Sequence, residues 1–412
     1  MPIKSDFINE INQRGFIYQS SDLDEIDSIM QKESITGYIG FDITSDSLHI
    51  GSLVQLMLLH WLDYYNHKSI ALLGGGTTLV GDPSGKDSSR KILQKDEIDK
   101  NISNITKTFG RFINLNKKSM IINNYEWLSN INYIEFLRDF GSAMTLNRML
   151  TFESIKNRLD REQPLSILEF NYMLLQSYDF YYLNKNYNCI LQMGGSDQWG
   201  NIINGVELIR RILQKDAFGL TTPLITLSSG AKMGKTEKGA VWLDKKLFSA
   251  YDYWQFWRNT SDQDVKKFLR YFTEIEENDL SQRINNEQDI NQLKILLANE
   301  ATKILHGEKI AKESEKTAKE TFHGSGVGKN LPEINMTKSQ IEKGINILDL
   351  LSLNNVVSSK SEARRAIQGK GIKINDISVL DEKKIINKDD FKENNYIKIS
   401  YGKKKHFIIK SV

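Results

Sequence analysis

The sequence predicts an α/β fold in which a parallel-sheet domain is followed by an α-helical domain and a small α+β domain. Three observations indicate this order. Between residue 35 and about residue 225, short apolar runs of strand length alternate with helical patterns, as in a parallel sheet covered by helices. Residues 245–323 are helical in pattern and highly charged. From Ile347 the tail begins again with a helix and continues in short β runs.

The strands of the first domain are predicted from apolar runs that end at turns. Residues 35–41 form a run of strand length that leads into the segment 40–51, where a helix begins. Residues 69–73 and 188–193 read as further buried strands, and each enters a glycine-rich turn. The chain between these strands, roughly 95–185, is mostly helical. We therefore predict a helical insertion between two halves of the sheet.

Composition places the remaining boundaries. A run rich in Gly and Ser precedes Pro332 and is typical of a linker. We predict a first domain at 1–225, an α-helical domain at 226–323, a linker at 324–346 and a small α+β domain at 347–412.

Bulk composition indicates a soluble globular protein, since 40% of the 412 residues are hydrophobic and 26% are charged. The one cysteine, Cys189, excludes an internal disulfide and a cysteine-based metal cluster, and the six histidines show no zinc spacing. Residues 1–10 lack the apolar core of a signal peptide. No apolar run approaches the roughly 20 residues of a membrane span. We therefore expect a cytoplasmic protein with no membrane segment and no metal site of its own.

The positive charge is concentrated at the C-terminal end. Residues 347–412 contain 14 Lys and Arg against 8 Asp and Glu, a net charge of +6, whereas the whole chain carries +3. The rest of the chain is therefore net negative. A basic domain appended to such a protein favours a polyanionic partner, and nucleic acid is the leading candidate.

The segment 40–51 is the most informative stretch for chemistry. Asp46 or Ser47 is expected to cap the following helix, which leaves backbone N–H groups and the positive end of the helix dipole at its mouth. Such a junction at the carboxyl edge of a parallel sheet holds an anion, most often a phosphate. His49 lies in this turn, and an isolated histidine would more readily be a core or capping residue. Far downstream, residues 232–236 read Lys-Met-Gly-Lys-Thr and form a cationic loop.

A His-Ile-Gly helix start followed much later by Lys-Met-x-Lys-Thr resembles the signature pair of class I aminoacyl-tRNA synthetases. Further segments resemble the bacterial tyrosyl-tRNA synthetases: Tyr-x-Gly-Phe-Asp at 38–42, Gly-Asp-Pro-Ser-Gly-Lys at 81–86, and the runs 168–180 and 194–201. The resemblance extends over nearly the whole chain, in the same order and at the same intervals. It implies a Rossmann-like catalytic domain that activates L-tyrosine with ATP and transfers it to tRNA(Tyr). It also implies a homodimer formed through the inserted helical region.

The resemblance implies a set of residues for the amino acid substrate. These are Tyr38, Asp82, Tyr172, Gln176, Asp179 and Gln198. Asp82, Tyr172 and Gln176 are assigned to the α-ammonium group, and Tyr38 and Asp179 to the phenolic hydroxyl. The residues themselves support the assignment, because positions 172, 176 and 179 fall on one helical face of a segment that is otherwise largely apolar. A polar stripe on a buried helix favours a pocket over a solvent-facing surface.

The resemblance also implies the residues for ATP. Thr44 and His49 are assigned to the phosphates, and the cations that close over pyrophosphate are Lys86, Arg90, Lys232 and Lys235. Further nucleotide contacts are assigned to Asp42, Gly51 and Asp197. The tyrosine carboxylate is already an ionised nucleophile, so catalysis should consist of positioning and charge stabilisation. Mg²⁺ would accompany ATP, held mainly by the phosphates.

The first signature departs from the family pattern at two positions. The family usually has proline where this chain has Ile43, and the fourth position of His-Ile-Gly-His is Ser52. Serine has a shorter side chain than histidine, so we expect Ser52 to reach the nucleotide ribose less readily.

The tail resembles an S4 RNA-binding domain, through residues 358–367 and 371–375. A helix there would project Lys360, Arg364 and Arg365 close to one face. The expected contacts are to phosphates and to the shape of the RNA, and binding should therefore depend on salt.

Two alternatives remain beside the tyrosine enzyme. A tryptophanyl-tRNA synthetase has the same fold, but an indole offers one N–H donor and no acceptor, so Tyr38 with Asp179 fits a phenol better. The other alternative is an RNA-binding or splicing scaffold that has lost catalysis. The presence of His49, Asp82 and both signature lysines argues against it.

Overall fold

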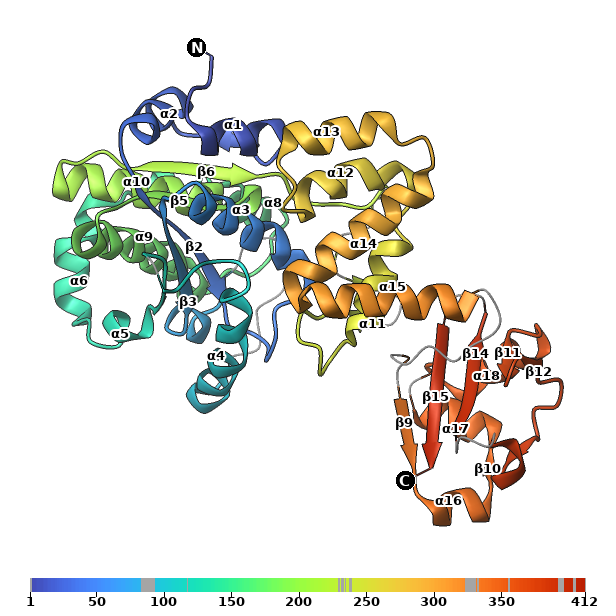
Figure 1. Cartoon of the computed structure of the whole chain (residues 1–412). Coiled ribbons are helices and arrows are strands. Elements are labelled where there is room, and N and C mark those ends of the chain that lie inside the picture. The colour runs from blue at the N-terminus through green and yellow to red at the C-terminus, as the bar shows by residue number, and fades with distance from the viewer. Residues whose placement is uncertain are drawn as a thin grey trace.

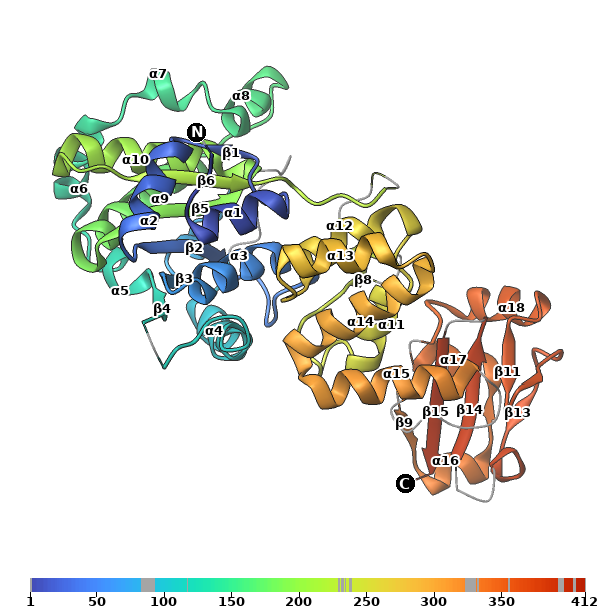
Figure 2. The same cartoon turned by 45° about the horizontal axis from the view of Figure 1, so that its top comes forward.

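The computed structural model describes the following residues: 2–82, 93–116, 118–228, 230, 233, 235–236, 239–322, 331, 333–354, 356–391, 396–402 and 405–411. They form a sheet domain, then a helical domain, then a small C-terminal domain that follows helix α15 (Glu308–Phe322), as Figure 1 and Figure 2 show. This architecture confirms the predicted fold class.

The main sheet has the strand order β1-β6-β5-β2-β3-β4. Its strands are β1 (Gln19–Ser20), β2 (Thr36–Asp42), β3 (Lys68–Gly74), β4 (Met120–Asn123), β5 (Cys189–Gly195) and β6 (Phe218–Thr222). Neighbours from β6 across to β4 run parallel, and the short edge strand β1 runs antiparallel to β6. The strand order reverses between β2 and β5. In a parallel sheet, ligands bind in the crevice outside the carboxyl ends at such a point.

Different helices cover the two faces of the sheet, because side chains alternate along each strand. Ile39 and Phe41 of β2 are buried in one core cluster with α3 (Leu53–Tyr64). Tyr38 points to the other face and is buried in a separate cluster with side chains of α9 (Ile167–Tyr187). The helix that carries the predicted polar stripe therefore lies on the same side of the sheet as Tyr38.

The sheet domain includes more of the predicted insertion at 95–185 than the sequence suggested. Besides α3 and α9, the helices of the sheet domain are α1 (Asp6–Gln13), α2 (Leu23–Lys32), α4 (Lys95–Phe109), α5 (Tyr125–Leu128), α6 (Tyr133–Asp139), α7 (Leu146–Met149), α8 (Glu153–Asp160) and α10 (Trp199–Leu213). Ile98 and Ile105 of α4 belong to the main core, and β4 pairs with β3. A strand of 4 residues is too short to be recognised from periodicity.

The helical domain packs against the sheet domain around a buried arginine. Its helices are α11 (Ala250–Arg258), α12 (Asp262–Phe272), α13 (Glu277–Asn286), α14 (Ile290–His306) and α15. Arg14, directly after α1, pairs with Glu10 at 2.6 Å and lies over the Trp61 ring of α3, 4.1 Å from its centroid. Its guanidinium also donates to the carbonyl oxygens of Arg270 and Thr273, at 2.6 and 3.2 Å. Arg14 thus joins α1, α3 and the end of α12.

The C-terminal domain has its own core and a sheet in the order β12-β11-β14-β15-β9. Its elements are β9 (Glu333–Met336), α16 (Lys338–Lys343), β10 (Ile345–Asn346), α17 (Ile347–Leu353), α18 (Lys360–Gln368), β11 (Ile372–Ile374), β12 (Ile377–Ser378), β13 (Ile385–Ile386), β14 (Tyr396–Tyr401) and β15 (Lys405–Ser411). β9 pairs parallel with β15, and Met336 and Ile341 are buried in this core. Residues 333–346 of the predicted linker therefore belong to the domain, because their apolar side chains enter its core.

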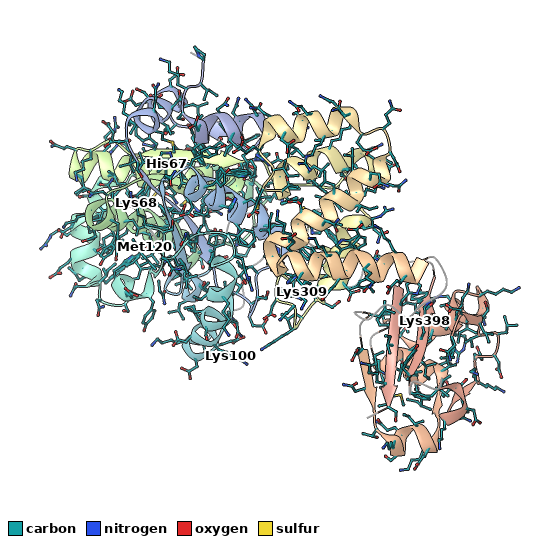
Figure 3. All side chains as sticks on the ribbon, viewed as in Figure 1. His67, Lys68, Lys100, Met120, Lys309 and Lys398 are labelled. Carbon is teal, nitrogen blue, oxygen red and sulfur yellow. The ribbon has the colours of Figure 1, made fainter. Side chains whose placement is uncertain are left out.

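Charged side chains lie mostly at the surface. Lys100 on α4 and Lys309 on α15 project into solvent (Figure 3). Lys398 of β14 is buried, and its ammonium group pairs with the Asp376 carboxylate at 3.0 Å, which offsets part of its desolvation. None of the helices in the described ranges combines the length and the apolar character that crossing a bilayer requires.

Candidate active site

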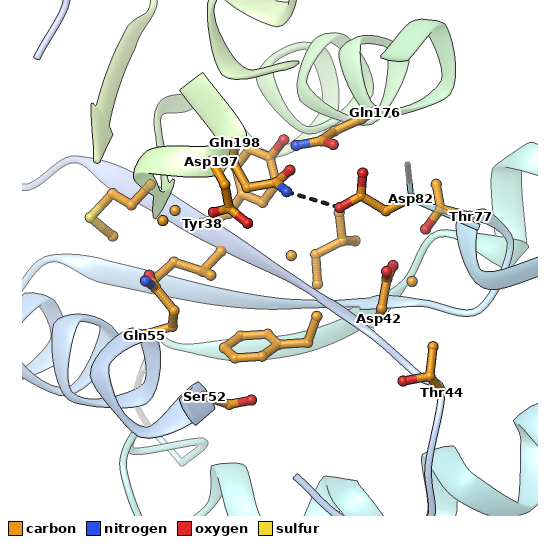
Figure 4. Close-up of a pocket in the computed structure, with 18 of the residues that line it drawn as sticks. Tyr38, Asp42, Thr44, Ser52, Gln55, Thr77, Asp82, Gln176, Asp197 and Gln198 are labelled. Carbon is orange, nitrogen blue, oxygen red and sulfur yellow. Dashed lines mark hydrogen bonds between the residues drawn. The ribbon is translucent and has the colours of Figure 1, made fainter. Parts of the chain in front are cut away.

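A cavity of about 370 Å³ opens at the carboxyl ends of β2 and β5, where the strand order reverses (Figure 4). Its walls come from β2 and β3 with the segments that follow them, from Asn124 after β4, from α9, and from β5 with the turn after it. The predicted site residues that line it are Tyr38, Asp42, Thr44, His49, Gly51, Asp82, Tyr172, Gln176, Asp179, Asp197 and Gln198. The structure therefore brings together residues from four separate stretches of sequence.

The predicted cations cannot be placed in the same way. Lys86, Arg90 and Lys232 lie outside the described residues. For Lys235 only the backbone is described, in β7 (Lys235–Thr236), which pairs with β8 (Gly239–Ala240).

The closed end of the cavity is formed by Tyr38 and Asp179. Both are buried, with 1% and 2% of their surface exposed. The Tyr38 hydroxyl has no hydrogen-bond partner among the described residues. Asp179 accepts hydrogen bonds from Asn124 Nδ2 at 2.8 Å and from Trp127 Nε1 at 2.7 Å. Burial raises the pKa of Asp179 to about 7, although these hydrogen bonds lower it. Burial, followed by the charge of Asp179, raises the pKa of Tyr38 well above its ordinary value.

Asn124 and Trp127 are site residues that the sequence analysis missed. Asn124 directly follows β4 and is oriented by Gly76 N–H, which donates to its Oδ1 at 2.7 Å. Trp127 stacks on Tyr182 of α9, with ring centroids 4.2 Å apart, so its N–H is aimed at Asp179. The available signal was positional: Asn124 follows a strand, and the carboxyl ends of parallel strands meet at one edge of the sheet.

Hydrogen-bond acceptors gather farther along the cavity. Gln198 Nε2 donates to Asp82 Oδ2 at 2.9 Å, the dashed line in Figure 4. Gln176 Oε1 is buried and has no partner in the described parts of the chain. Tyr172 donates its hydroxyl proton to Asp42 Oδ1 at 3.1 Å, which links the helix α9 to the end of β2. A carboxylate and an unpaired amide oxygen facing one cavity suit a ligand with several N–H protons.

The helix after β2 is capped differently from the prediction. We expected Asp46 or Ser47 as the cap, and that was wrong. His49 caps the 3₁₀ turn Ile50–Ser52 that leads into α3, and its Nδ1 accepts from Gly51 N–H at 2.9 Å. Ser47 is engaged elsewhere, because its hydroxyl donates to Leu48 O at 2.9 Å. A neutral imidazole that accepts at Nδ1 carries its proton on Nε2, so the other edge of the His49 ring is a donor.

The first signature pairs with residues that follow the second signature, although the two stretches are far apart in sequence. Ile50 N–H donates to Val241 O at 2.8 Å, and Leu243 N–H donates to Leu48 O at 2.9 Å. A Cβ added to Gly51 would lie 2.6 Å from the His49 ring and 3.3 Å from Met233 O, so only glycine fits this approach. Residues 48–51, which line the cavity, are therefore held from behind by residues 241–243 and lie close to the Met233 carbonyl.

The departure from the family pattern at Ile43 has a local explanation. Ile43 is fully buried, and its N–H donates to Thr78 Oγ1 at 2.9 Å, a hydrogen bond that proline could not make. Ser52 lines the cavity, and the side chain that follows it one turn later, Gln55, also does. Gln55 donates to Thr222 Oγ1 at 2.8 Å, and its buried Oε1 has no partner within the described ranges.

The predicted RNA-binding residues lie on α18, at the surface of the C-terminal domain. Lys360 pairs with Asp349, and Arg364 pairs with Glu382 at 3.0 Å. Arg365 is exposed on the same helix. Exposed ion pairs contribute little stability, so these cations can exchange a carboxylate for a phosphate.

Comparison with known proteins agrees with the geometry. Residues 30–323 match the family described as tRNA synthetases class I (W and Y), and residues 324–409 match the tyrosine–tRNA ligase SYY-like C-terminal domain. The chain is 54% identical to the tyrosine–tRNA ligase of Pelagibacter ubique, covering 98% of this chain and 99% of that one. It is 49% identical to the tyrosine–tRNA ligase of Xanthobacter autotrophicus, covering 99% of each.

Solved structures share the fold. A C-terminally truncated mitochondrial tyrosyl-tRNA synthetase of Aspergillus nidulans superposes with a TM-score of 0.70 at 27% identity, covering 77% of this chain and 95% of that one. A tryptophanyl-tRNA synthetase of Encephalitozoon cuniculi gives a TM-score of 0.55 at 14% identity, with 74% and 87% covered, which shows the common fold alone. The matches over the whole length decide between these branches: this chain belongs to the tyrosine–tRNA ligase family of class I aminoacyl-tRNA synthetases.

Proposed function

We propose that this protein activates L-tyrosine with ATP to form tyrosyl-adenylate and pyrophosphate, and then transfers the tyrosine to the 3′ end of tRNA(Tyr). The observation that carries the proposal is the closed end of the cavity. There the Tyr38 hydroxyl, which has no partner in the described part of the chain, and the Asp179 carboxylate face one buried space. A phenol can donate to Asp179 and accept from Tyr38. An indole would leave the Tyr38 hydroxyl without a partner, at the cost of an unmade buried hydrogen bond.

The remaining tyrosine contacts follow from the position of the ring. With its hydroxyl at the closed end, the α-ammonium group reaches Asp82, Tyr172 and Gln176, whose oxygens face the cavity. Gln198 holds the Asp82 carboxylate through the 2.9 Å hydrogen bond and lies on the tyrosine side. This arrangement fixes the tyrosine carboxylate toward the open mouth.

ATP occupies the mouth, where the lining residues Thr44, His49 and Asp197 are exposed. We assign the ATP phosphates to Thr44 and to the donor edge of the His49 ring. The nucleotide would approach the backbone closely at Gly51, and its ribose would face Asp42 and Asp197. The tyrosine carboxylate attacks the α-phosphorus in line and pyrophosphate leaves, so no group on the protein forms a covalent bond. The protein contributes orientation and positive charge where negative charge develops.

The charge on the departing pyrophosphate requires cations. We assign this role to Lys86, Arg90, Lys232 and Lys235, because lysine acts as a point charge on a flexible stem. Among the described residues, no group of His, Cys, Asp or Glu side chains is arranged to hold a metal ion. We propose that Mg²⁺ arrives with ATP, ligated mainly by its phosphates.

We also propose a homodimer, formed through the helical region after β4. Large apolar side chains are exposed there, including Tyr133 at 62%, Ile134 at 71% and Ile167 at 80%. Several exposed large apolar side chains in one region are typical of a protein interface. The C-terminal domain would bind tRNA phosphates through Lys360, Arg364 and Arg365, and we place the protein in the cytoplasm, where ATP and tRNA are available.

Exchange of radiolabelled pyrophosphate into ATP, measured with one amino acid at a time, tests the proposal. We expect exchange with tyrosine and none above background with tryptophan or phenylalanine. Exchange with tryptophan alone would identify the other enzyme of this fold. Absence of exchange with every amino acid would identify a scaffold without catalysis.

A further inference from the structure

The chain that leads into the second signature is held by the first turns of α12. Ser228 N–H donates to Asp264 Oδ2 at 3.0 Å, and the Ser228 and Ser261 hydroxyls lie 3.1 Å apart. The ammonium group of Lys267 donates to Thr226 O at 3.3 Å. Residues 226–228, which we call the entry strap, are therefore fixed to a helix of the helical domain just before the segment that contains the signature.

Asp264 differs from the other acid in the same turn of α12. Asp262 and Asp264 both lie in the first turn, so each carboxylate interacts favourably with the positive end of the helix dipole. The Asp262 side chain is 69% exposed and pairs with Lys294 on α14. Asp264 is only 5% exposed, and the contact described for its carboxylate outside α12 is the entry strap. Burying a carboxylate is expensive, so its placement against a backbone N–H calls for a structural or functional reason.

The far end of the signature segment is fixed to the first signature. Val241 and Leu243 form the backbone hydrogen bonds to residues 48–50 described above. Between the two ends, Met233 N–H donates to Ile225 O at 3.3 Å, and Met233 O approaches Gly51. The entry strap thus sets where the segment starts relative to residues 48–51 of the first signature.

We infer that Asp264 is a positioning residue for the activation step. It holds the entry strap in register with the first signature. The segment that carries Lys232 and Lys235, which act on the leaving pyrophosphate, therefore begins at a fixed position. Asp264 touches neither substrate. The inference rests on the function proposed above, and it goes further by assigning a requirement for activation to a carboxylate in the helical domain, outside the cavity.

The test compares Asp264→Ala with Asp262→Ala in the full chain, using pyrophosphate exchange. Both variants lose one negative charge from the same helix turn, but only the first releases the entry strap. We expect Asp264→Ala to lower kcat about ten- to hundredfold, as misplaced catalytic groups do, with KM for tyrosine within about twofold of wild type. Asp264→Asn keeps an acceptor oxygen but loses the charge, so it should recover part of the loss and leave kcat severalfold below wild type. Trypsin should also cut after Lys232 or Lys235 faster in Asp264→Ala than in Asp262→Ala.

Equal kcat values for the Asp264→Ala and Asp262→Ala variants would overturn the inference. So would a rise in KM for tyrosine that matches the fall in kcat/KM, because that pattern means general damage to the sheet domain. If Asp264→Ala does not fold, Asp264→Asn against Asp262→Asn decides, with a severalfold lower kcat expected for the former and equality refuting the role. Wild-type protein without tyrosine-dependent exchange would instead reject the proposed function itself.

Discussion

Asp179→Asn removes a buried carboxyl group at almost constant size and so isolates its charge. In the folded protein burial raises the pKa of this carboxyl to about 7, against an ordinary value of 3.8. Between these pH values the unfolded chain has released the proton and the folded chain still holds it. Folding then takes up a proton, and stability falls as the pH rises.

The size of the effect follows from the two pKa values. Below about pH 4 both states are protonated and Asp179 has no effect on stability. From there to about pH 7 the free energy of unfolding falls by about 1.4 kcal/mol per pH unit, which amounts to about 4 kcal/mol in total. Asparagine has no proton to release and avoids this loss. The variant should therefore gain on wild type by up to about 4 kcal/mol between pH 4 and pH 8.

Denaturant unfolding at a series of pH values, followed by tryptophan fluorescence, measures this difference, and subtracting wild type cancels the titration of other groups. Asp216→Asn, the same exchange at an exposed site, serves as the matched control. At the same time the variant should lose about tenfold or more in kcat/KM for tyrosine, since a charged acceptor for the phenol has gone. Parallel pH curves for Asp179→Asn and wild type would refute the raised pKa. Unchanged discrimination against phenylalanine would refute the contact with the hydroxyl.

Three further predictions test other parts of the structure. Trp127→Phe keeps an aromatic ring but removes a donor to Asp179, so the pH at which kcat/KM for tyrosine reaches half its maximum should move upward; an unmoved profile counts against the ionised carboxylate as the binding form. Arg14→Met leaves the buried Glu10 carboxylate without its cationic partner and should lower the free energy of unfolding, measured in urea, by about 3–5 kcal/mol. Glu10→Gln in the same chain should partly restore this loss, and a loss that the second change does not reduce contradicts the pairing. Ile167→Asp places a charge on the proposed dimer face and should shift the protein to monomer in sedimentation velocity, whereas an unchanged sedimentation coefficient excludes this face as the contact.

Part of the site could be read from local spacing. Tyr172, Gln176 and Asp179 share a helical face by their intervals alone, and in the structure all three line one cavity. Tyr38 joined them in the sequence analysis through family resemblance, and its orientation toward α9 follows from alternation along β2. Regular periodicity and a long helix made this end of the site predictable.

The rest depended on contacts between distant segments. Asn124 and Trp127 reach Asp179 only because β4 adds to the edge of β3, and a strand of 4 residues leaves no periodic signal. The cap at His49 was missed for a similar reason. Ser47 is the more usual capping residue, but its oxygen accepts from Asp244 N–H at 3.2 Å, a partner nearly the length of the sheet domain away in sequence. Such choices are made by tertiary neighbours and not by local propensity.

Residues 48–50 form backbone hydrogen bonds with residues 241–243. Because of this long separation in sequence, the two ends of the cavity are completed at different times during synthesis of the chain. A nascent chain emerges N-terminus first, at about 5–20 residues per second. Every described residue at the closed end of the cavity has been made once β6 is complete at Thr222. Residues 48–50, next to the positions that we assign to ATP, obtain their backbone partners only when Val241 and Leu243 have been made. During synthesis, the residues that we assign to tyrosine binding are therefore complete before the segment that we assign to activation.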